Sequence, residues 1–432
     1  MGRVIKVLWF TNTPSLAAAT LNMPVVGGGW IESLERQVRQ REGIDLAVAF
    51  NHGKEKLHKF SEAGTTYYAI PDSRSRASVF IGRHLASDGD DQLVDQYLAV
   101  IEDFKPDIIN IFGTEKSFGL ITERIGIPVV IHLQGILTMY ERKYFPPGIS
   151  KGTLLKRSDL KSLIKATSLF HQYRSFKAAA FREQRIFAMN RYFMGRTDWD
   201  KRVTSILSPG AEYFTGNEIL RPQFYTAQWK DKIRETKTFI STIQPNIYKG
   251  LETVLECAAL LKNMPGFRFK WIIAGIPEEH TLVKLFERRI GYRFRDVNVQ
   301  LKGKMTADEL LKAELDADVF VHPSHIDNSP NSVCEAMLIG MPVIATDTGG
   351  TGSLLNDGKE GVLIQDGDPH SLAGALLELS NDRSYAAQLG RNARERAGQR
   401  HAPEEITDNL LNIYFGLIKK KESRSPAPVV SL

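Results

Sequence analysis

The amino-acid sequence predicts an α/β protein with two doubly wound parallel sheets, each in a domain of its own. Three observations support this prediction. The chain has 432 residues, which is long for one hydrophobic core. Short apolar runs alternate with segments of helical period, which is the pattern of parallel strands joined by helices. Two such series occur, and between them residues 196–229 carry turn residues, two prolines and scattered aromatics without a clear period.

The first series begins with the apolar run at residues 4–10, which has the length of one strand. A glycine-rich loop follows it and leads into a helical pattern carried by Ile31, Leu34 and Val38. Strands covered by helices on both faces are continuous apolar runs, because neither face meets water. We therefore predict the other strands of the first sheet at residues 46–50, 107–112, 128–133 and 189–195.

The second series starts near Thr238 and shows the same alternation. Its strands are predicted at residues 238–243, 268–275, 297–301, 319–322 and 343–346, and its helices begin at Gly250 or cover 281–289, 307–314 and 330–339. The unpatterned join gives an N-terminal domain, 1–225, and a C-terminal domain, 226–403. Ligands of such sheets bind beyond the carboxyl ends of the strands, so we expect one cleft shared by both sheets. The tail, 421–432, is predicted to be disordered.

The overall composition is that of a soluble globular protein. Hydrophobic residues make up 42% and charged residues 25% of the chain. No apolar run reaches the roughly 18 residues that a membrane helix needs. The run at residues 4–10 contains Lys6 and lacks a cleavage site, so it is not a secretion signal. The only cysteines, Cys257 and Cys334, favour a reducing, cytoplasmic location, and no Cys/His cluster has zinc-ligand spacing.

Positive charge is concentrated in one segment. Residues 141–185 hold 11 Lys or Arg against 3 acidic residues, whereas the whole chain has a net charge of +6. Leucines lie among the lysines of this segment, so it resembles a basic amphipathic helix that lies on an anionic membrane. A solvated helix face explains the same pattern. No nucleic-acid-binding motif is present, and nucleic acid is not an expected partner.

The segment 319–350 carries most of the functional information. A predicted strand ends at His322, and the polar loop that follows includes Asp327, Asn328 and Ser329. We expect Ser329 to cap the next helix, because serine is a favoured N-cap residue and a proline follows it.

The start of that helix has the properties of an anion site. Unsatisfied N–H groups and the helix dipole favour phosphate there, and Asn331, Ser332 and Val333 would offer the amides. Glu335 lies on the same helix face and could accept hydrogen bonds from a ribose diol, while Asp327 is placed to accept from sugar hydroxyls. An ordinary capped helix with two exposed acids explains the spacing equally well.

The amino-acid sequence of the segment also resembles that of a known family. Seven residues separate Asp327 from Glu335 within Asp-Asn-Ser-Pro-Asn-Ser-Val-Cys-Glu-Ala. This resembles the donor-binding signature of retaining GT-B glycosyltransferases of family 4 (glycosyl transferases group 1), in a bacterial subgroup associated with surface polysaccharides. The resemblance covers about residues 4–415. It implies two Rossmann-like domains facing across a cleft, a helix at 404–420 that returns towards the N-terminal domain, and no metal or other cofactor.

The same resemblance implies further site residues. Lys249-Gly250 resembles the Lys-Gly pair whose ammonium neutralises the departing diphosphate. Family members also carry an Arg a few residues earlier and a Glu at position 327, and this chain has neither. Thr242 or Gln244 would supply a hydrogen bond at the first of these places, without a charge.

In the N-terminal domain the resemblance points to three strand ends. Gly28 and Gly29 match a glycine loop that approaches the donor phosphates, and His132 matches a histidine close to the reacting sugar. The end of the preceding strand is expected to face the acceptor through Gly113, Thr114 and Glu115. The catalytic residues implied are thus His132, Lys249 and Asp327.

These observations predict a glycosyltransferase that moves a sugar from a nucleoside-diphosphate sugar to a hydroxyl of a glycan or lipid-linked acceptor. The expected pathway is lipopolysaccharide, capsule or exopolysaccharide synthesis, and the expected location is cytoplasmic or peripheral at the inner face of the membrane. Two alternatives stay open, a nucleotide-sugar epimerase of the same fold and an inactive nucleotide-sugar-binding protein.

Overall fold

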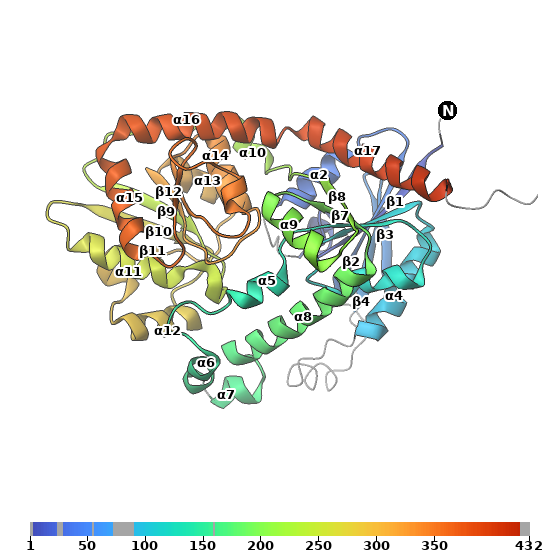
Figure 1. The fold of residues 1–432 in the computed structure, drawn as a ribbon, viewed down its shortest axis with the longest axis horizontal. Coiled ribbons are helices and arrows are strands. Elements are labelled where there is room, and N and C mark those ends of the chain that lie inside the picture. The colour runs from blue at the N-terminus through green and yellow to red at the C-terminus, as the bar shows by residue number, and fades with distance from the viewer. Residues whose placement is uncertain (1–2, 24–28, 54–55, 72–89, 159, 424–432) are drawn as a thin grey trace, which may run out of the picture.

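A computed structural model of the chain describes residues 3–23, 29–53, 56–71, 90–158 and 160–423. Its two α/β domains lie side by side along the long axis, and the last two helices, α16 (Arg383–Arg400) and α17 (Pro403–Glu422), follow one another along the top of the C-terminal and N-terminal domains in the view of Figure 1. Two separate sheets, one in each domain, confirm the predicted fold class.

The N-terminal sheet has the order β3-β4-β2-β1-β5-β6-β7-β8. Every pair of neighbouring strands is parallel except β3 and β4, which form an antiparallel hairpin at one edge. The strands are Ile5–Thr11 (β1), Ile44–His52 (β2), His58–Glu62 (β3), Thr65–Pro71 (β4), Ile108–Phe112 (β5), Val129–His132 (β6), Tyr192–Gly195 (β7) and Glu212–Thr215 (β8).

The C-terminal sheet is parallel throughout and has the order β11-β10-β9-β12-β13-β14. In chain order this is 3-2-1-4-5-6, the doubly wound arrangement whose ligand site lies where the winding direction reverses, between β9 and β12. The strands are Lys237–Thr242 (β9), Phe269–Ala274 (β10), Val299–Leu301 (β11), Val319–His322 (β12), Val343–Thr346 (β13) and Val362–Ile364 (β14).

Helices cover both faces of the two sheets (Figure 1). In the N-terminal half they are Ala17–Thr20 (α1), Trp30–Val38 (α2), Asp90–Phe104 (α4), Leu137–Arg142 (α5), Lys151–Arg157 (α6), Leu160–Ile164 (α7), Leu169–Met189 (α8) and Asp198–Leu207 (α9). The others are Pro222–Thr226 (α10), Leu251–Lys262 (α11), Thr281–Ile290 (α12), Ala307–Leu315 (α13), Asn331–Ile339 (α14), Pro369–Asn381 (α15), Arg383–Arg400 (α16) and Pro403–Glu422 (α17). Short 3-10 turns lie at Ser117–Arg124, Ile247–Lys249, Phe294–Val297 and Thr351–Ser353.

The chain crosses between the domains twice. Residues 216–221 lead from β8 into α10, which packs on α13 and α14. After α16, α17 returns and packs on α2 and β5 of the N-terminal domain. There the buried Tyr414 hydroxyl accepts a hydrogen bond from Trp9 Nε1 (3.0 Å).

A cluster of aromatic side chains joins the two domains, and we call it the aromatic bridge. It consists of Tyr140, Tyr144, Tyr173, Phe176 and Tyr248. The first four belong to the segment from α5 to α8, and Tyr248 belongs to the loop after β9. The rings of Tyr140 and Tyr144 lie 5.5 and 5.9 Å from that of Tyr248. Tyr140, Tyr144 and Tyr173 are part of the same buried cluster as the core of the C-terminal domain.

The ends of the molecule differ in part from the sequence prediction. The predicted tail begins at 421, but α17 continues to Glu422, because its packing on the N-terminal domain supports the last turn. The rest of the predicted tail, 424–432, lies outside the described residues. Within the described ranges, no helix combines the length and apolarity needed to cross a membrane.

Candidate active site

The candidate active site lies at the carboxyl ends of β9 and β12, where the doubly wound sheet reverses direction. The loop after β9 carries Lys249, and the loop after β12 carries Asp327. Gly250 sits between Lys249 and α11 with φ of 73°. A Cβ on Gly250 would collide with the Pro323 carbonyl, so glycine lets the two loops approach each other.

Lys249 and Asp327 form an ion pair. The Lys249 ammonium donates to Asp327 Oδ2 at 2.5 Å, and both side chains are largely buried. His322 Nε2 lies 3.3 Å from the same oxygen, and the Tyr140 hydroxyl donates to Oδ1 (3.3 Å). Burial alone would raise the pKa of Asp327, but the Lys249 charge and the contact with His322 outweigh it and hold that pKa well below its usual range. Asp327 is therefore a fixed anion beside a fixed cation.

The start of α14 differs from the prediction. Ser329 does not cap the helix, since its hydroxyl donates to Glu218 Oε1 (2.7 Å) and the N-cap residue is Pro330. The Val333 amide, predicted to face a phosphate, donates to the Pro330 carbonyl at 2.9 Å. The amides of Asn331 and Ser332 precede the first intrahelical bond and are the ones left to receive an anion.

Glu335 lies on α14 but is not exposed to solvent. Arg221 grips it with two hydrogen bonds, Nε to Oε1 (2.7 Å) and Nη2 to Oε2 (2.6 Å). Burial raises the pKa of Glu335 while Arg221 lowers it, and the net shift is upward. A second buried carboxyl, Glu314, is close enough to contribute to this field, and its own pKa is raised by burial and by Glu335. A ribose diol would reach Glu335 only after Arg221 shifts.

His132 ends β6 as predicted, but its ring is enclosed. It is 1% exposed, stacks on Phe112 (5.5 Å) and meets Trp30 edge-on (5.0 Å). Its Nε2–H donates to the Gly216 carbonyl at 2.9 Å. Burial and the Arg196 charge lower the pKa of His132 to about 3, so the ring is neutral at physiological pH. It can position a group but cannot supply positive charge.

Of the three residues predicted to face the acceptor, Gly113 and Glu115 lie at the turn after β5, whereas Thr114 holds a buried carboxyl group. Gly113 has φ of 87°, and Glu115 Oε2 accepts from Asn12 Nδ2 (2.8 Å) beside the turn. Thr114 was predicted to face the acceptor, but it is fully buried and its hydroxyl donates to the buried Glu183 carboxyl. That carboxyl also accepts the amides of Leu137 and Thr138, so Thr114 helps to fix α5.

The glycine loop is described only at its end. Gly28 lies outside the described residues, whereas Gly29 is the N-cap of α2 with φ of 70°. A Cβ added to Gly29 would lie 3.1 Å from Arg221 Cγ. The glycine loop thus ends against the side chain that holds Glu335.

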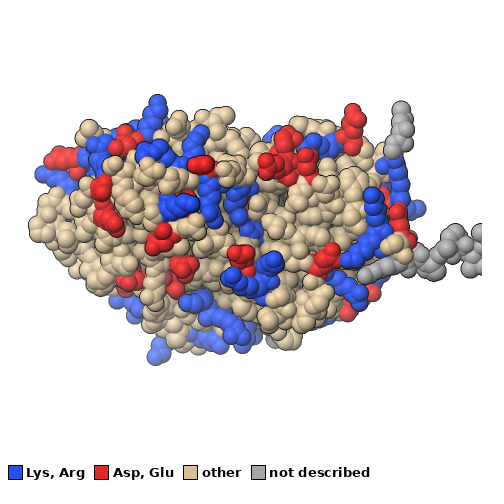
Figure 2. Space-filling view, turned by 45° about the horizontal axis from the view of Figure 1, so that its top comes forward, with Lys and Arg blue, Asp and Glu red and all other residues tan. Residues whose placement is uncertain are grey.

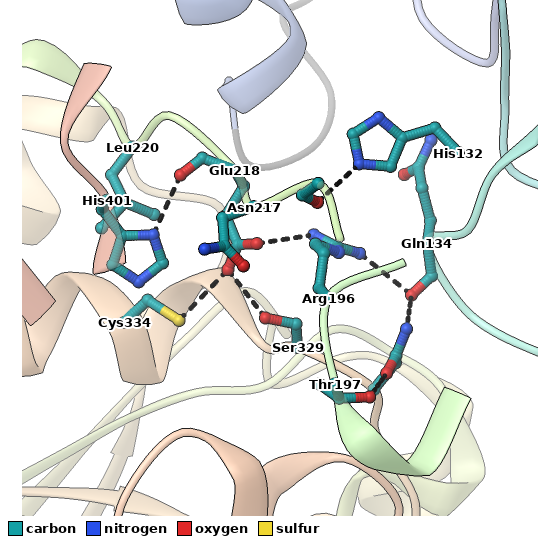
Figure 3. Close-up of polar contacts among 12 residues, drawn as sticks. His132, Gln134, Arg196, Thr197, Asn217, Glu218, Leu220, Ser329, Cys334 and His401 are labelled. Carbon is teal, nitrogen blue, oxygen red and sulfur yellow. Dashed lines mark hydrogen bonds and ion pairs between the residues drawn. The ribbon is translucent and has the colours of Figure 1, made fainter. Parts of the chain in front are cut away.

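Sequence reasoning missed a buried network around Glu218 (Figure 3). Glu218 lies in the first domain crossing, and its Oε2 is 3.5 Å from Arg196 Nη1 of the N-terminal domain. From the C-terminal domain Cys334 donates to Oε1 (3.3 Å), and His401, in the second crossing, donates to the Glu218 carbonyl (2.9 Å). Arg196 was within reach of prediction, because it follows a strand end as His132 does.

Glu218, Cys334 and His401 have the donor atoms of a metal site, all within 4.8 Å of one another. The surroundings favour hydrogen bonds instead. Burial raises the pKa of the Cys334 thiol well above its usual range, so the thiol keeps its proton and donates it. The guanidinium groups of Arg196 and Arg400 also face Glu218. Two cations beside a protonated thiol disfavour a third cation.

Comparison with known families shows what kind of domain holds this site. Residues 226–396 match the family described as glycosyl transferases group 1. The chain carries a group 1 glycosyltransferase domain. This glycosyltransferase domain contains Lys249, Asp327 and the residues of α14 that were predicted to bind the donor, whereas the predicted Gly28 and Gly29 lie outside it.

Two curated relatives of this chain are named for polysaccharide synthesis. The colanic acid biosynthesis glycosyltransferase WcaL of Salmonella typhimurium is 32% identical over 38% of this chain and 41% of its own length. The amylovoran biosynthesis glycosyltransferase AmsK of Erwinia amylovora is 23% identical over 74% of this chain and 78% of its own. The chain thus spans less than half of the first relative and about three quarters of the second.

Solved structures share the fold of this chain over nearly its whole length. Sucrose-phosphate synthase from Thermosynechococcus elongatus is 14% identical, with a TM-score of 0.71, and the match covers 96% of this chain and 100% of the other. Anabaena HepE, solved with UDP-glucose, is 15% identical with a TM-score of 0.63, covering 95% and 100%. At these identities the likeness establishes the GT-B fold and nothing finer.

Proposed function

We propose that the protein transfers a glycosyl group from a nucleoside-diphosphate sugar to a hydroxyl of a glycan or lipid-linked acceptor. The observation that carries this proposal is the buried Lys249–Asp327 pair at the reversal point of a group 1 glycosyltransferase domain. The names of WcaL and AmsK support polysaccharide synthesis as the process.

The donor is proposed to lie across the start of α14. The amides of Asn331 and Ser332 and the positive end of the helix dipole suit a diphosphate, and Lys249 adds a full charge. The structure of HepE, a protein of similar fold, contains UDP-glucose, and this supports a nucleoside diphosphate as the leaving group. On this proposal Lys249 takes the part that a metal ion plays in other transferases, and no cofactor takes part.

The chemistry follows from where charge develops. The bond between the anomeric carbon and the donor phosphate oxygen breaks, and a bond forms from that carbon to the acceptor oxygen. The acceptor proton passes to the departing phosphate oxygen. Lys249 stabilises the negative charge on the diphosphate as the bond breaks, and Asp327 holds the ammonium in place. Attack on the face from which the diphosphate leaves gives retention of configuration.

A panel of nucleoside diphosphates and their sugars tests the proposal. We expect one nucleotide to raise the melting temperature and its sugar to be consumed only when an acceptor is present. Thermal-shift and mass-spectrometric assays measure the two effects. Donor conversion without acceptor would indicate an epimerase, and stabilisation without any conversion would indicate a binding protein. Either outcome contradicts the transferase proposal.

We further propose that α6 and α7 place the enzyme on an anionic membrane. Within residues 151–165, Leu155, Leu160 and Ile164 are 46%, 73% and 60% exposed. The lysines and arginine of the same stretch are also exposed, and they are Lys151, Lys156, Arg157, Lys161 and Lys165. This stretch of the basic segment forms two short helices, α6 and α7, which project from the lower edge of the molecule (Figure 1). Apolar side chains ringed by cations suit insertion among anionic headgroups.

The face drawn in Figure 2 does not show a basic track of the kind that binds nucleic acid. On the face drawn in Figure 2, basic and acidic side chains are interspersed. A nucleic-acid-binding surface instead concentrates basic residues in a patch or stripe.

Flotation with vesicles tests the membrane surface. The double substitution L160E/I164E should lower binding to vesicles that contain phosphatidylglycerol by about tenfold or more, because each apolar side chain buried contributes roughly 1.5 kcal/mol or more. Ile206 on α9 is 77% exposed, and I206E is the matched control, expected to bind like the wild type. Equal loss in both variants, or binding to neutral vesicles alone, would refute the assignment.

A further inference from the structure

Three consecutive side chains of the loop after β12 bond to three different parts of the molecule. Asp327 bonds to Lys249 and Tyr140, and Ser329 bonds to Glu218 in the domain crossing. Asn328 lies between them and points into the N-terminal domain, where it is completely buried. The loop that carries the proposed catalytic carboxylate is therefore held by the opposite domain through its very next residue.

The amide of Asn328 is bonded on both sides. Its Oδ1 accepts from Thr197 Oγ1 at 2.6 Å. Its Nδ2 donates to Asp200 Oδ2 (2.8 Å) and to the Gln134 carbonyl (3.1 Å). All three partners belong to the N-terminal domain, so these bonds exist only while the two domains are together.

The receiving site, defined as Thr197, Asp200 and the Gln134 carbonyl, is organised by its own domain. Thr197 and Asp200 form a capping box at the start of α9. Asp200 also accepts the Arg196 amide (2.9 Å), and Arg196 Nη2 donates to the Gln134 carbonyl (3.0 Å). Because these groups are positioned without help from Asn328, they form a preorganised receptor for one primary amide.

The contact reaches Asp327 through the backbone. The Asn328 amide N–H donates to Asp327 Oδ1 (3.1 Å), and the Gly350 amide donates to the Asp327 carbonyl (2.9 Å). A Cβ on Gly350 would collide with the Asn328 carbonyl and with Thr197, so the loop is tightly enclosed on this side. A shift of the Asn328 side chain must therefore move the peptide that orients the carboxylate.

We propose that Asn328 is a positioning residue that couples closure of the two domains to the geometry of the Lys249–Asp327 pair. The inference rests on the proposed function of that pair. With Asn328 seated in its receiving site, Asp327 is oriented to hold Lys249 at the diphosphate. With the domains apart, Asn328 is unseated and the pair loses its alignment, so the donor binds without reacting.

Substitution of Asn328 tests the coupling. N328A should lower kcat by about 10²-fold, because small misplacement of reacting groups has effects of that size. The dissociation constant for the donor should stay close to the wild-type value, since Lys249 and α14 are unchanged. T197V removes one of the three bonds and should lower kcat by about tenfold. The kcat of the double variant should be no lower than that of N328A, because both changes remove the bond between Asn328 and Thr197. The loss of the Thr197 cap of α9 is measured separately, as a change in the free energy of unfolding.

A readout of shape separates this role from simple loss of stability. Small-angle scattering with UDP present should give a larger radius of gyration for N328A than for the wild type. Donor-binding stoichiometry corrects for any unfolded fraction. N392A is the matched control, since Asn392 is a half-buried asparagine on α16, remote from Asn328, that bonds to the Lys359 carbonyl and to Gln388. It should match the wild type in every assay.

The outcomes are distinct. A wild type without transferase activity would overturn the proposed function and the catalytic part of this inference with it. An active wild type together with N328A of equal kcat would overturn the coupling alone. A larger radius with unchanged kcat would show that Asn328 joins the domains without positioning Asp327, which also contradicts the proposal.

Discussion

Replacing Lys249 with Ala should lower glycosyl transfer by about 10²- to 10³-fold, because the variant has no charge to stabilise the departing diphosphate. The substitution also leaves Asp327 buried without its cation, which should lower the free energy of unfolding by about 3 kcal/mol. Steady-state kinetics and chemical denaturation measure the two effects.

A second substitution separates catalysis from stability. In K249A/D327N the buried charge is gone, so stability should recover while transfer stays low. The pKa of Asp327 is held low in the folded protein, so its stabilising effect is present above about pH 4 and fades as the pH falls through the folded pKa. The difference in the free energy of unfolding between the wild type and K249A should therefore become smaller at acidic pH. Wild-type turnover by K249A would rule out the proposed role.

Replacing Arg221 with Ala should lower the free energy of unfolding by about 3–5 kcal/mol. The change leaves the Glu335 carboxylate buried without a partner and close to Glu314. R268A is the matched control, because Arg268 pairs with Glu235 at an exposed site where the side chains are 65% and 78% accessible. Exposed pairs contribute roughly 0–1 kcal/mol. Denaturant titrations of both variants measure the difference.

Donor binding supplies an independent readout for the same pair. If the ribose diol takes the place of Arg221 on Glu335, R221A should keep measurable affinity for the nucleotide, whereas E335A should lose it. Equal destabilisation by R221A and R268A would show that the bidentate pair is no stronger than a surface contact. Retained nucleotide affinity in E335A would remove Glu335 from the proposed donor site.

The sequence predicted the central strands well because their signal is local. In the C-terminal sheet β9, β10, β12 and β13 begin and end within one residue of the predicted bounds, since buried parallel strands are continuous apolar runs. The edge strand β3 of the β3–β4 hairpin was missed for the same reason. Four of the five β3 residues are exposed, so the strand carries no apolar pattern to detect.

The site was only partly predictable. Lys249, Asp327 and Glu335 stand out because each follows a strand end or helix start that the sequence already defines. Their partners do not: Arg221 meets Glu335 across 114 positions, in a linker without periodicity. Asn328 was seen as a polar loop residue, and nothing in the sequence indicates that its side chain enters the other domain. Contacts between the domains depend on how the two folded domains pack against each other. Local sequence patterns do not contain that information.

The aromatic bridge limits how this protein can be divided or recombined. A cut in the chain near residue 225 would separate the two sheets, yet Tyr140, Tyr144 and Tyr173 would stay with one piece while the core that they complete stays with the other. Helix α17 would stay with the C-terminal piece, but it packs against Trp9 of the N-terminal domain, so the cut would also break this contact. A chimera that exchanges donor specificity must therefore carry residues 140–176 along with the C-terminal domain and leave α17 with the N-terminal one. The two domains are therefore interlocked, and a domain exchanged at the linker alone would lack residues that complete its core.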